Sequence, residues 1–376
     1  MLKNEGVEIS WFAPLCNGDD EFLGEHNPKY KSNWVNTMKI VKTADKLGYK
    51  NILLPSSYQV GQDTLTFASA IAPMVKNINL LIAIRCGEIH PPMLAKAIAT
   101  LDHILEGKLT INIISSDLPG TKLSSKERYL KSKEVIEILN QSWTKNKIDF
   151  KGDFYNLQIP SDPVKPYQKG GPLLYFGGYS PKGIDLCAKY CNVYLMWPET
   201  ETRLKKMIYK MKKKAAGYNR QIAFGLRIHV IVRKTELEAK KYAKKLISKL
   251  DIAKGDEIRN RSQDSKSIGD TRQKEMRLIS DENYYLEDNI WTGIGLARSG
   301  CGAAIVGNPE QVLNKINRYI DMGIRSFILS GYPHKKEAEL FAKFVLPKIK
   351  NVSLPVVFNR IPKKTPNTPL ANGKRN

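Results

Sequence analysis

An arginine and a histidine lie two residues apart in one strongly apolar stretch, residues 224–232, which reads F-G-L-R-I-H-V-I-V. Its apolar, β-branched character predicts a buried strand, in which Arg227 and His229 point to the same face. Burying a cation and an imidazole there is costly unless a polar or anionic group meets them. The pair is therefore either a structural ion pair beside a hydrogen-bonded core histidine, or an anion site with a proton donor at a strand end. An ordinary histidine pKa of about 6.5 suits that donor role.

Strand-like and helix-like stretches alternate around this pair along the chain. The expected strands span residues 7–14, 51–55, 79–86, 108–115, 173–179, 193–197, 224–232 and 326–331, with a short apolar segment at 303–306. Helical patterns lie between them. Eight strands alternating with helices predict a single (β/α)8 TIM barrel, an α/β fold, rather than two doubly wound domains. Functional side chains are then expected at the carboxyl ends of the strands.

Three segments interrupt this rhythm. Residues 149–157 predict a short hairpin. Residues 251–283 are rich in Asp, Lys, Arg and Ser and poor in apolar residues, which indicates a mobile insertion, either a lid over the site or an idle loop. The last residues are polar and rich in proline. We therefore expect one domain over residues 1–350 and a C-terminal tail over 351–376.

Composition narrows the class of function. The formal net charge of +23 could indicate nucleic acid, an anionic membrane or an anionic substrate. The lysines, however, are spread along exposed-looking helix faces without a basic platform interleaved with aromatic residues. We therefore expect compositional bias and no nucleic-acid partner. No apolar run reaches the roughly 18 residues of a membrane span, and no apolar signal-peptide core follows Met1.

The cysteines bear on the cellular compartment. They are odd in number and scattered, at Cys16, Cys86, Cys187, Cys191 and Cys301. No second Cys or His pair accompanies the closely spaced Cys187 and Cys191. This pattern favours reduced thiols in the cytoplasm and no metal site.

Six short motifs together carry a resemblance. They read W-F-A-P (11–14), A-D-K-L-G-Y (44–49), I-A-I-R (82–85), Y-F-G-G (175–178), F-G-L-R-I-H-V-I-V-R (224–233) and L-S-G-Y-P-H (329–334). In this order they resemble the bacterial-luciferase-like flavin monooxygenases, and most closely the alkanesulfonate monooxygenases, over roughly residues 7–350. The resemblance implies a TIM barrel, reduced FMN (FMNH2) as cosubstrate, O2, a separate NAD(P)H-dependent flavin reductase and a homo-oligomer.

The resemblance also implies residue roles. The residues that match its catalytic positions are Arg227, His229, Arg298 and Tyr332. Those that match substrate-binding positions are Trp197, His334 and the same two arginines. Trp197 could instead be a core residue, and Tyr332 could cap the last strand.

Five further positions match the flavin site of this family. They are Asn112 near the ring, Tyr129 near the phosphate, and Gly178, Tyr179 and Ser180 in the loop that binds the phosphate. A glycine-containing loop that enters a helix presents backbone N–H groups, so a phosphate is physically sensible there.

Two departures concern the substrate. The cysteine usual after the second strand is missing from P-S-S-Y-Q-V-G-Q-D, where Val60 or Gly61 is nearest. The histidine expected after the first strand is also missing, and Cys16 or Asn17 takes its place. Both loops are expected to face the flavin and the substrate.

The reaction implied is oxygenolytic desulfonation of an alkanesulfonate to an aldehyde and sulfite through a flavin peroxide. Arg227 and Arg298 would meet the sulfonate with their forked donors. The alternatives are a related flavin monooxygenase acting on a sulfone, an amine or a carbonyl compound, and a non-catalytic flavin-binding barrel.

Overall fold

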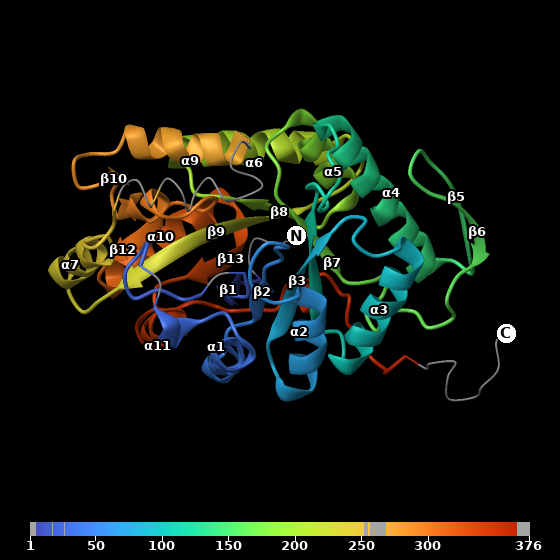
Figure 1. Ribbon diagram of the computed structural model, residues 1–376, viewed down its shortest axis with the longest axis horizontal. Helices are drawn as coiled ribbons and strands as arrows, with labels where there is room; N and C mark the ends of the chain where they lie inside the picture. Colours follow the sequence, from blue (N-terminus) through green and yellow to red (C-terminus); the bar gives the residue numbers. More distant parts are fainter. Residues whose placement is uncertain (1–4, 17, 26, 252–254, 256–267, 367–376) are drawn as a thin grey trace.

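A closed barrel of eight parallel strands forms the centre of the molecule (Figure 1). The computed structural model describes residues 5–16, 18–25, 27–251, 255 and 268–366. The barrel strands are β1 (Glu8–Phe12), β2 (Asn51–Leu54), β3 (Asn79–Arg85), β4 (Leu109–Ile114), β7 (Leu173–Phe176), β8 (Val193–Met196), β9 (Ala223–Val232) and β13 (Ile324–Ser330). The pairing of β9 with both β8 and β13 closes the sheet. The prediction of a single (β/α)8 TIM barrel is confirmed.

Helices surround this barrel in the order that the alternating pattern predicts. They are α1 (Trp34–Leu47), α2 (Thr64–Ile71), α3 (Pro91–Ile104), α4 (Ser125–Thr144), α5 (Pro181–Tyr190), α6 (Glu201–Ala216), α7 (Glu236–Leu246), α10 (Pro309–Met322) and α11 (His334–Phe344). Local sequence sets their ends. The α4 helix begins with a reciprocal capping box between Ser124 and Glu127. The α1 helix ends at Gly48, whose φ of 88° suits glycine.

The remaining elements extend or close the barrel. The predicted hairpin is present as β5 (Lys147–Lys151) and β6 (Asn156–Pro160). The sequence missed β10 (Tyr285–Glu287) and β11 (Ile290–Trp291), which with β12 (Ala304–Gly307) continue the sheet beyond β9. The first two are too short to show an alternating pattern.

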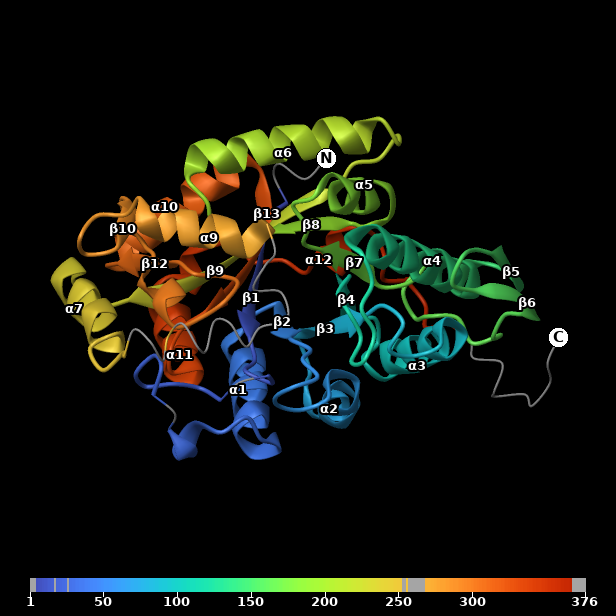
Figure 2. The same cartoon turned by 45° about the horizontal axis from the view of Figure 1, so that its top comes forward.

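Two of the predicted segments lie partly outside the described residues. Of the expected lid, residues 252–254 and 256–267 lie outside, and the described remainder contains α9 (Ile268–Leu278). Of the expected tail, 367–376 lie outside, whereas α12 (Leu354–Val357) packs next to β7 (Figure 2). No helix in the described part of the chain is long and apolar enough to cross a membrane.

The two ends of the barrel interior differ in polarity. At the amino-terminal end, the fully buried Glu8 carboxylate accepts hydrogen bonds from Asn51, Tyr175, Ser326 and the backbone N–H of Leu354. Inward-facing leucines and Ile328 fill the layer above it. Inside the barrel, the polar groups that could meet a ligand therefore lie at the other end, where the strands terminate.

One buried carboxylate should make stability depend on pH. Asp102 of α3 accepts hydrogen bonds from the backbone N and the Nε2 of Gln168, each at 2.8 Å. Burial raises its pKa from 3.8 to about 6. The folded protein therefore holds this proton more tightly than the unfolded chain does. The stability that Asp102 contributes is full below about pH 4 and is lost as the pH rises through about 6.

The measurement is the free energy of unfolding in urea, from pH 4 to 7.5, for the wild type and Asp102→Asn. The shift corresponds to about 3 kcal/mol, so the advantage of the wild type should shrink by that order as the pH rises. The exposed carboxylate of Asp149 on β5 provides the control Asp149→Asn, for which little change is expected. A difference between wild type and Asp102→Asn that stays constant with pH would contradict the prediction.

Candidate functional site

Arg227 and His229 face the barrel interior from β9, next to the end of β13. Parallel pairing sets Arg227 opposite Ile328 and His229 opposite Ser330. The Ser330 hydroxyl lies 2.8 Å from Arg227 Nη1, which donates to it, and 2.7 Å from His229 Nδ1. The guanidinium also stacks over the Phe12 ring, 4.5 Å from its centroid. One hydroxyl on the neighbouring strand therefore fixes both side chains.

The alternative of a structural ion pair fails for Arg227. Its side chain is only 7% exposed, yet no carboxylate lies within ion-pair distance among the described residues. Burial lowers its pKa below the ordinary value of an arginine, and the group stays charged at neutral pH. A buried guanidinium without an anionic partner is costly, and a bound anion would offset that cost.

The pKa of His229 differs from the value that its residue type alone suggests. Burial, and then the charge of Arg227, lower its pKa well below the ordinary 6.5. The imidazole is therefore neutral near pH 7, whereas the sequence-based argument used its unperturbed pKa. It can accept or donate one hydrogen bond but does not add a positive charge to the site.

A second histidine is held by a carboxylate from the loop after β1. Asp19 accepts hydrogen bonds from the backbone N and from Nδ1 of His334, each at 2.6 Å. His334 is 1% exposed, and its Nε2 has no hydrogen-bond partner among the described residues. The Tyr332 ring lies between the two histidines, 5.3 Å from His229 and 5.0 Å from His334 by centroids. Asp19 thus orients the imidazole and leaves Nε2 for a ligand.

Asp20, next in the loop, forms an ion pair with Arg298. Burial raises the pKa of Asp20, and the charge of Arg298 opposes this effect. For Arg298, burial favours a lower pKa, but Tyr332 and the two aspartates outweigh it and raise the pKa. The guanidinium lies over the Tyr332 ring, 5.1 Å from its centroid. Arg298 is therefore permanently charged and already has an anionic partner.

The Asp19–His334 contact leads to a prediction. In Asp19→Asn, an amide NH2 replaces one carboxylate oxygen. One of the two donors of His334 then meets another N–H donor, and that hydrogen bond is lost. Loss of such an orienting partner typically costs 10- to 100-fold in activity. We expect a fall of that size in kcat, with the fold intact by circular dichroism. Asp45→Asn is the control, because Asp45 also accepts backbone hydrogen bonds, from residues 76–78, but lies on α1. Unchanged kcat in Asp19→Asn would show that His334 needs no orientation.

The predicted phosphate loop follows β7 and enters α5. Ser180 is the N-cap of α5, and its Oγ accepts from Gly183 N at 3.1 Å. A Cβ on Gly183 would lie 3.0 Å from the Tyr129 hydroxyl, and one on Gly178 would lie 2.8 Å from the Phe176 ring. The structure therefore brings Tyr129, Gly178 and Ser180 together at the start of a ten-residue helix. These residues suit a phosphate, which a helix N-terminus favours.

Asn112 and Tyr179 complete the set of expected flavin residues. Asn112 on β4 pairs with Ala83 and with Tyr175 in the sheet. It is partly exposed at the barrel mouth, the end of the barrel at which the strands terminate. The Tyr179 side chain, in contrast, points away from the α5 N-terminus. Its hydroxyl accepts from Trp197 N at 2.7 Å. Only the backbone of Tyr179 is therefore placed to meet a phosphate at the start of α5.

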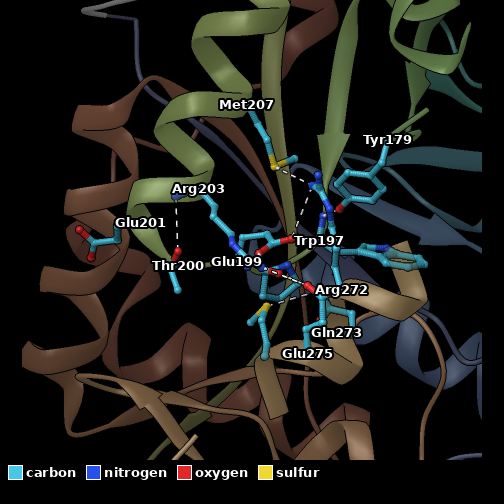
Figure 3. Close-up of polar contacts among 12 residues, drawn as sticks. Tyr179, Trp197, Glu199, Thr200, Glu201, Arg203, Met207, Arg272, Gln273 and Glu275 are labelled. Atoms are coloured by element: carbon cyan, nitrogen blue, oxygen red, sulfur yellow. Dashed lines mark hydrogen bonds and ion pairs between the residues drawn. The ribbon is translucent and has the colours of Figure 1, made fainter. Parts of the chain in front are cut away.

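Trp197 and Tyr179 form part of a wall covered by α9 (Figure 3). A Cβ on Gly269 would lie 2.7 Å from the Trp197 ring and 2.9 Å from the Tyr179 ring. Arg272 lies over the Tyr179 ring at 5.0 Å and forms an ion pair with Glu199, which is buried and also meets Arg203.

Gln273 of the same helix links two loops. Its Nε2 donates to Pro198 O, and its Oε1 accepts from Gly302 N. The α9 helix thus holds together the loop carrying Trp197 and the segment that follows Arg298.

Sequence reasoning missed four polar residues at the mouth. They are Asp19, Asp20, Arg85 and Ser330. Arg85 ends the apolar strand β3 and is 6% exposed, so the argument used for Arg227 would have found it. The two aspartates lie in the loop after the first strand and Ser330 ends the last, so all three satisfy the barrel rule for functional positions.

The two loops that lack the expected histidine and cysteine, after β1 and after β2, pack on each other. A Cβ on Gly61 would lie 1.9 Å from Leu15 O, and Gln62 N donates to Leu15 O. Burial raises the pKa of Cys16 to about 12, so its thiol is unreactive at neutral pH. Val60 is 46% exposed. Asn17 lies outside the described residues.

Known proteins with similar sequences bear on this arrangement. The model of the luciferase-like monooxygenase family matches residues 7–326. A protein of Agrobacterium fabrum named sulfoquinovose monooxygenase is 52% identical over 373 residues, covering 99% of this chain and 97% of that protein. One of the same name from Novosphingobium aromaticivorans is 46% identical over 355 residues, covering 93% of this chain and 98% of that protein.

A solved structure supports the fold alone. The structure of riboflavin lyase (RcaE) with modified FMN and riboflavin superposes with a TM-score of 0.75 at 13% identity. The match covers 98% of this chain and 95% of that chain. At such identity the likeness concerns the barrel and leaves the reaction to the site.

Proposed function

This chain belongs to the luciferase-like monooxygenase family, and from that premise we propose that it is an FMNH2-dependent monooxygenase that cleaves the C–S bond of a sulfonate. The observation that carries the proposal is the buried Arg227, which has no carboxylate partner among the described residues and lies beside two histidines at the barrel mouth. A sulfonate supplies the missing anion, with three oxygens for a forked donor.

The proposed substrate class is a sulfonated sugar such as sulfoquinovose rather than a simple alkanesulfonate. The names of two relatives at 52% and 46% identity favour it. Asp19 and Asp20 add carboxylate oxygens at the mouth, which suit substrate hydroxyl groups. The missing cysteine and histidine of the alkanesulfonate pattern agree with a different substrate in the same barrel.

The proposed reaction balances with one molecule of O2. The C–S bond breaks and a C=O bond forms at the same carbon, giving an aldehyde and bisulfite. One oxygen atom enters the aldehyde and the other leaves as water. Two electrons come from FMNH2 and two from the substrate carbon. When bound, reduced FMN supplies the electrons that activate O2, with Tyr129, Gly178 and Ser180 holding its phosphate.

The proposed roles of the other residues follow from their surroundings. Arg227 binds the sulfonate, and neutral His229 offers a hydrogen bond beside it. Burial raises the pKa of Tyr332, so its phenol stays protonated and donates. His334 offers Nε2 as a proton acceptor or donor, oriented by Asp19. Trp197 and α9 exclude water from the reacting centre.

The test is a coupled assay with FMN, NADPH and any flavin reductase. Sulfite is measured for sulfoquinovose and a panel of alkanesulfonates against a control without the protein. Sulfite from sulfoquinovose in excess of the alkanesulfonates is the expected result. Sulfite from alkanesulfonates alone would move the substrate back to that class. Absence of sulfite from every sulfonate would overturn the proposed reaction.

A further inference from the structure

We infer that a second anion site, for a small doubly charged oxyanion of the sulfate or phosphate kind, lies at the amino-terminal end of the barrel. A polar cavity of about 210 Å³ opens there, lined by Arg220, Arg360 and Lys189 together with Asn140 and Asn192. Arg220 lies just before β9, and Arg360 lies in the segment after α12. The cavity is therefore at the end of the barrel opposite the mouth. The inference is independent of the proposed reaction.

The two guanidinium groups are held in place by backbone carbonyl groups. Arg220 Nη1 donates to Ala188 O at 2.9 Å, in the last turn of α5. Arg360 Nη1 donates to Lys169 O at 2.7 Å, and Lys169 N donates back to Arg360 O at 2.8 Å. A Cβ at Gly170 would lie 2.8 Å from Arg360 Nη1, so glycine there allows the close approach. Each guanidinium uses one of its five donors in this way.

In the described part of the chain, these positive charges have no carboxylate partner. Neither arginine forms an ion pair among the described residues, and no residue lining the cavity is acidic. Burial, followed by the charge of Arg220, lowers the pKa of Arg360, so the two cations act on each other. Two half-buried like charges are unfavourable unless an anion joins them.

The neighbouring carboxylates are engaged elsewhere. Glu137 accepts a hydrogen bond from the Tyr190 hydroxyl. Asp185 pairs with Lys214 and accepts from the Tyr218 hydroxyl. Neither Glu137 nor Asp185 lines the cavity.

The donors present select the class of ligand. Two guanidinium groups bind oxyanions through paired N–H···O contacts, which a tetrahedral ion with several oxygens can accept at once. Asn192 Oδ1 already accepts from Leu174 N at 2.9 Å, so its free contribution is the NH2 donor. Lys189 adds charge at the rim, where its Nζ lies 5.1 Å from the Tyr190 ring centroid. Chloride and acetate satisfy fewer of these donors.

The site would also join distant parts of the chain. Arg360 belongs to the segment after α12, which lies next to β7 in Figure 2, whereas Lys189 belongs to α5 and Arg220 to the loop between α6 and β9. An anion held between them links the C-terminal segment to the barrel. Because the ligand binds only the folded state, it should raise the temperature of unfolding in a saturable way.

The test titrates inorganic sulfate, phosphate and sulfite into the protein by calorimetry, at ionic strength held constant with NaCl. Arg220→Gln and Arg360→Gln should each weaken sulfate binding at least tenfold. The control Arg318→Gln removes the same charge from an exposed arginine paired with Glu201, and should change the affinity less than twofold. The relative affinities of the three ions identify which oxyanion the site prefers.

The sulfate affinities of two further variants test where the anion binds. Lys189→Gln alters an exposed side chain and should weaken binding two- to fivefold without loss of folding. Arg227→Ala, at the opposite end, should leave this sulfate affinity unchanged. Equal sulfate affinity in the wild type, Arg220→Gln and Arg360→Gln would overturn the site. Sulfate binding that disappears in Arg227→Ala would instead assign the anion to the barrel mouth.

Discussion

Replacing Arg227 with alanine is expected to lower kcat/KM for sulfite release by about a hundred- to ten-thousandfold. Hydrogen bonds to charged groups contribute about 1.5–3 kcal/mol each, and a forked contact to a sulfonate makes two of them. On this face of the barrel, His229 is neutral and the Ser330 hydroxyl is already shared between Arg227 and His229, so neither supplies the charged donor that is lost. The loss should therefore fall on both substrate binding and turnover.

The matched control for this experiment is Arg325→Ala. Arg325 is also 7% exposed, but it lies at the start of β13, where it donates to Ile320 O and Ile324 O. Its removal should cost stability without abolishing sulfite release by the folded fraction. If Arg227→Ala keeps more than a tenth of the wild-type kcat/KM while remaining folded, another group holds the sulfonate.

The second large effect concerns the buried ion pair of Arg298 and Asp20. Removing one partner of such a pair leaves an uncompensated charge and typically costs about 3–5 kcal/mol, whereas removing both is often nearly neutral. Arg298→Ala should therefore lower the free energy of unfolding by that amount, and Asp20→Ala/Arg298→Ala should restore most of it. Urea unfolding measures both variants.

Activity and pH separate the two roles of this pair. If Arg298 also binds substrate, sulfite release should stay low in the double variant although stability returns. In Arg298→Ala, Asp20 loses the positive charge that opposes the effect of burial, so its pKa rises further and the destabilisation should be larger at pH 8 than at pH 5. Full activity in the double variant would restrict Arg298 to a structural role.

The arginines at the barrel mouth differ in whether a carboxylate neutralises their charge. Arg298 is paired with Asp20, whereas Arg227 and Arg85 have no carboxylate within ion-pair distance among the described residues. The Arg85 guanidinium donates to the backbone oxygen of Asp117, at 3.4 Å. We therefore propose that Arg227 and Arg85 contribute most of the attraction for an incoming sulfonate. The predicted contact of Arg298 with the sulfonate would have to form beside its ion pair with Asp20.

Much of the architecture was determined by the sequence itself. Strand and helix periodicity, with stops such as Gly48, placed the eight barrel strands to within a few residues. That accuracy arises because each apolar strand is buried on both faces and each helix needs local caps. The same pattern identified Arg227 and His229, since charged residues inside an apolar strand stand out against their neighbours. The motifs then indicated the family, and the comparisons support it.

Tertiary structure decided which residues meet and in what state. Asp19 and His334 are 315 positions apart in the chain, and only closure of the barrel between β13 and β1 brings them into contact. Burial, which no local pattern specifies, makes His229 neutral. The pairing of Arg298 with Asp20 and the side-chain direction of Tyr179 likewise depend on packing between distant loops. Sequence fixes local periodicity and residue type, whereas desolvation and long-range contacts arise only when the barrel closes.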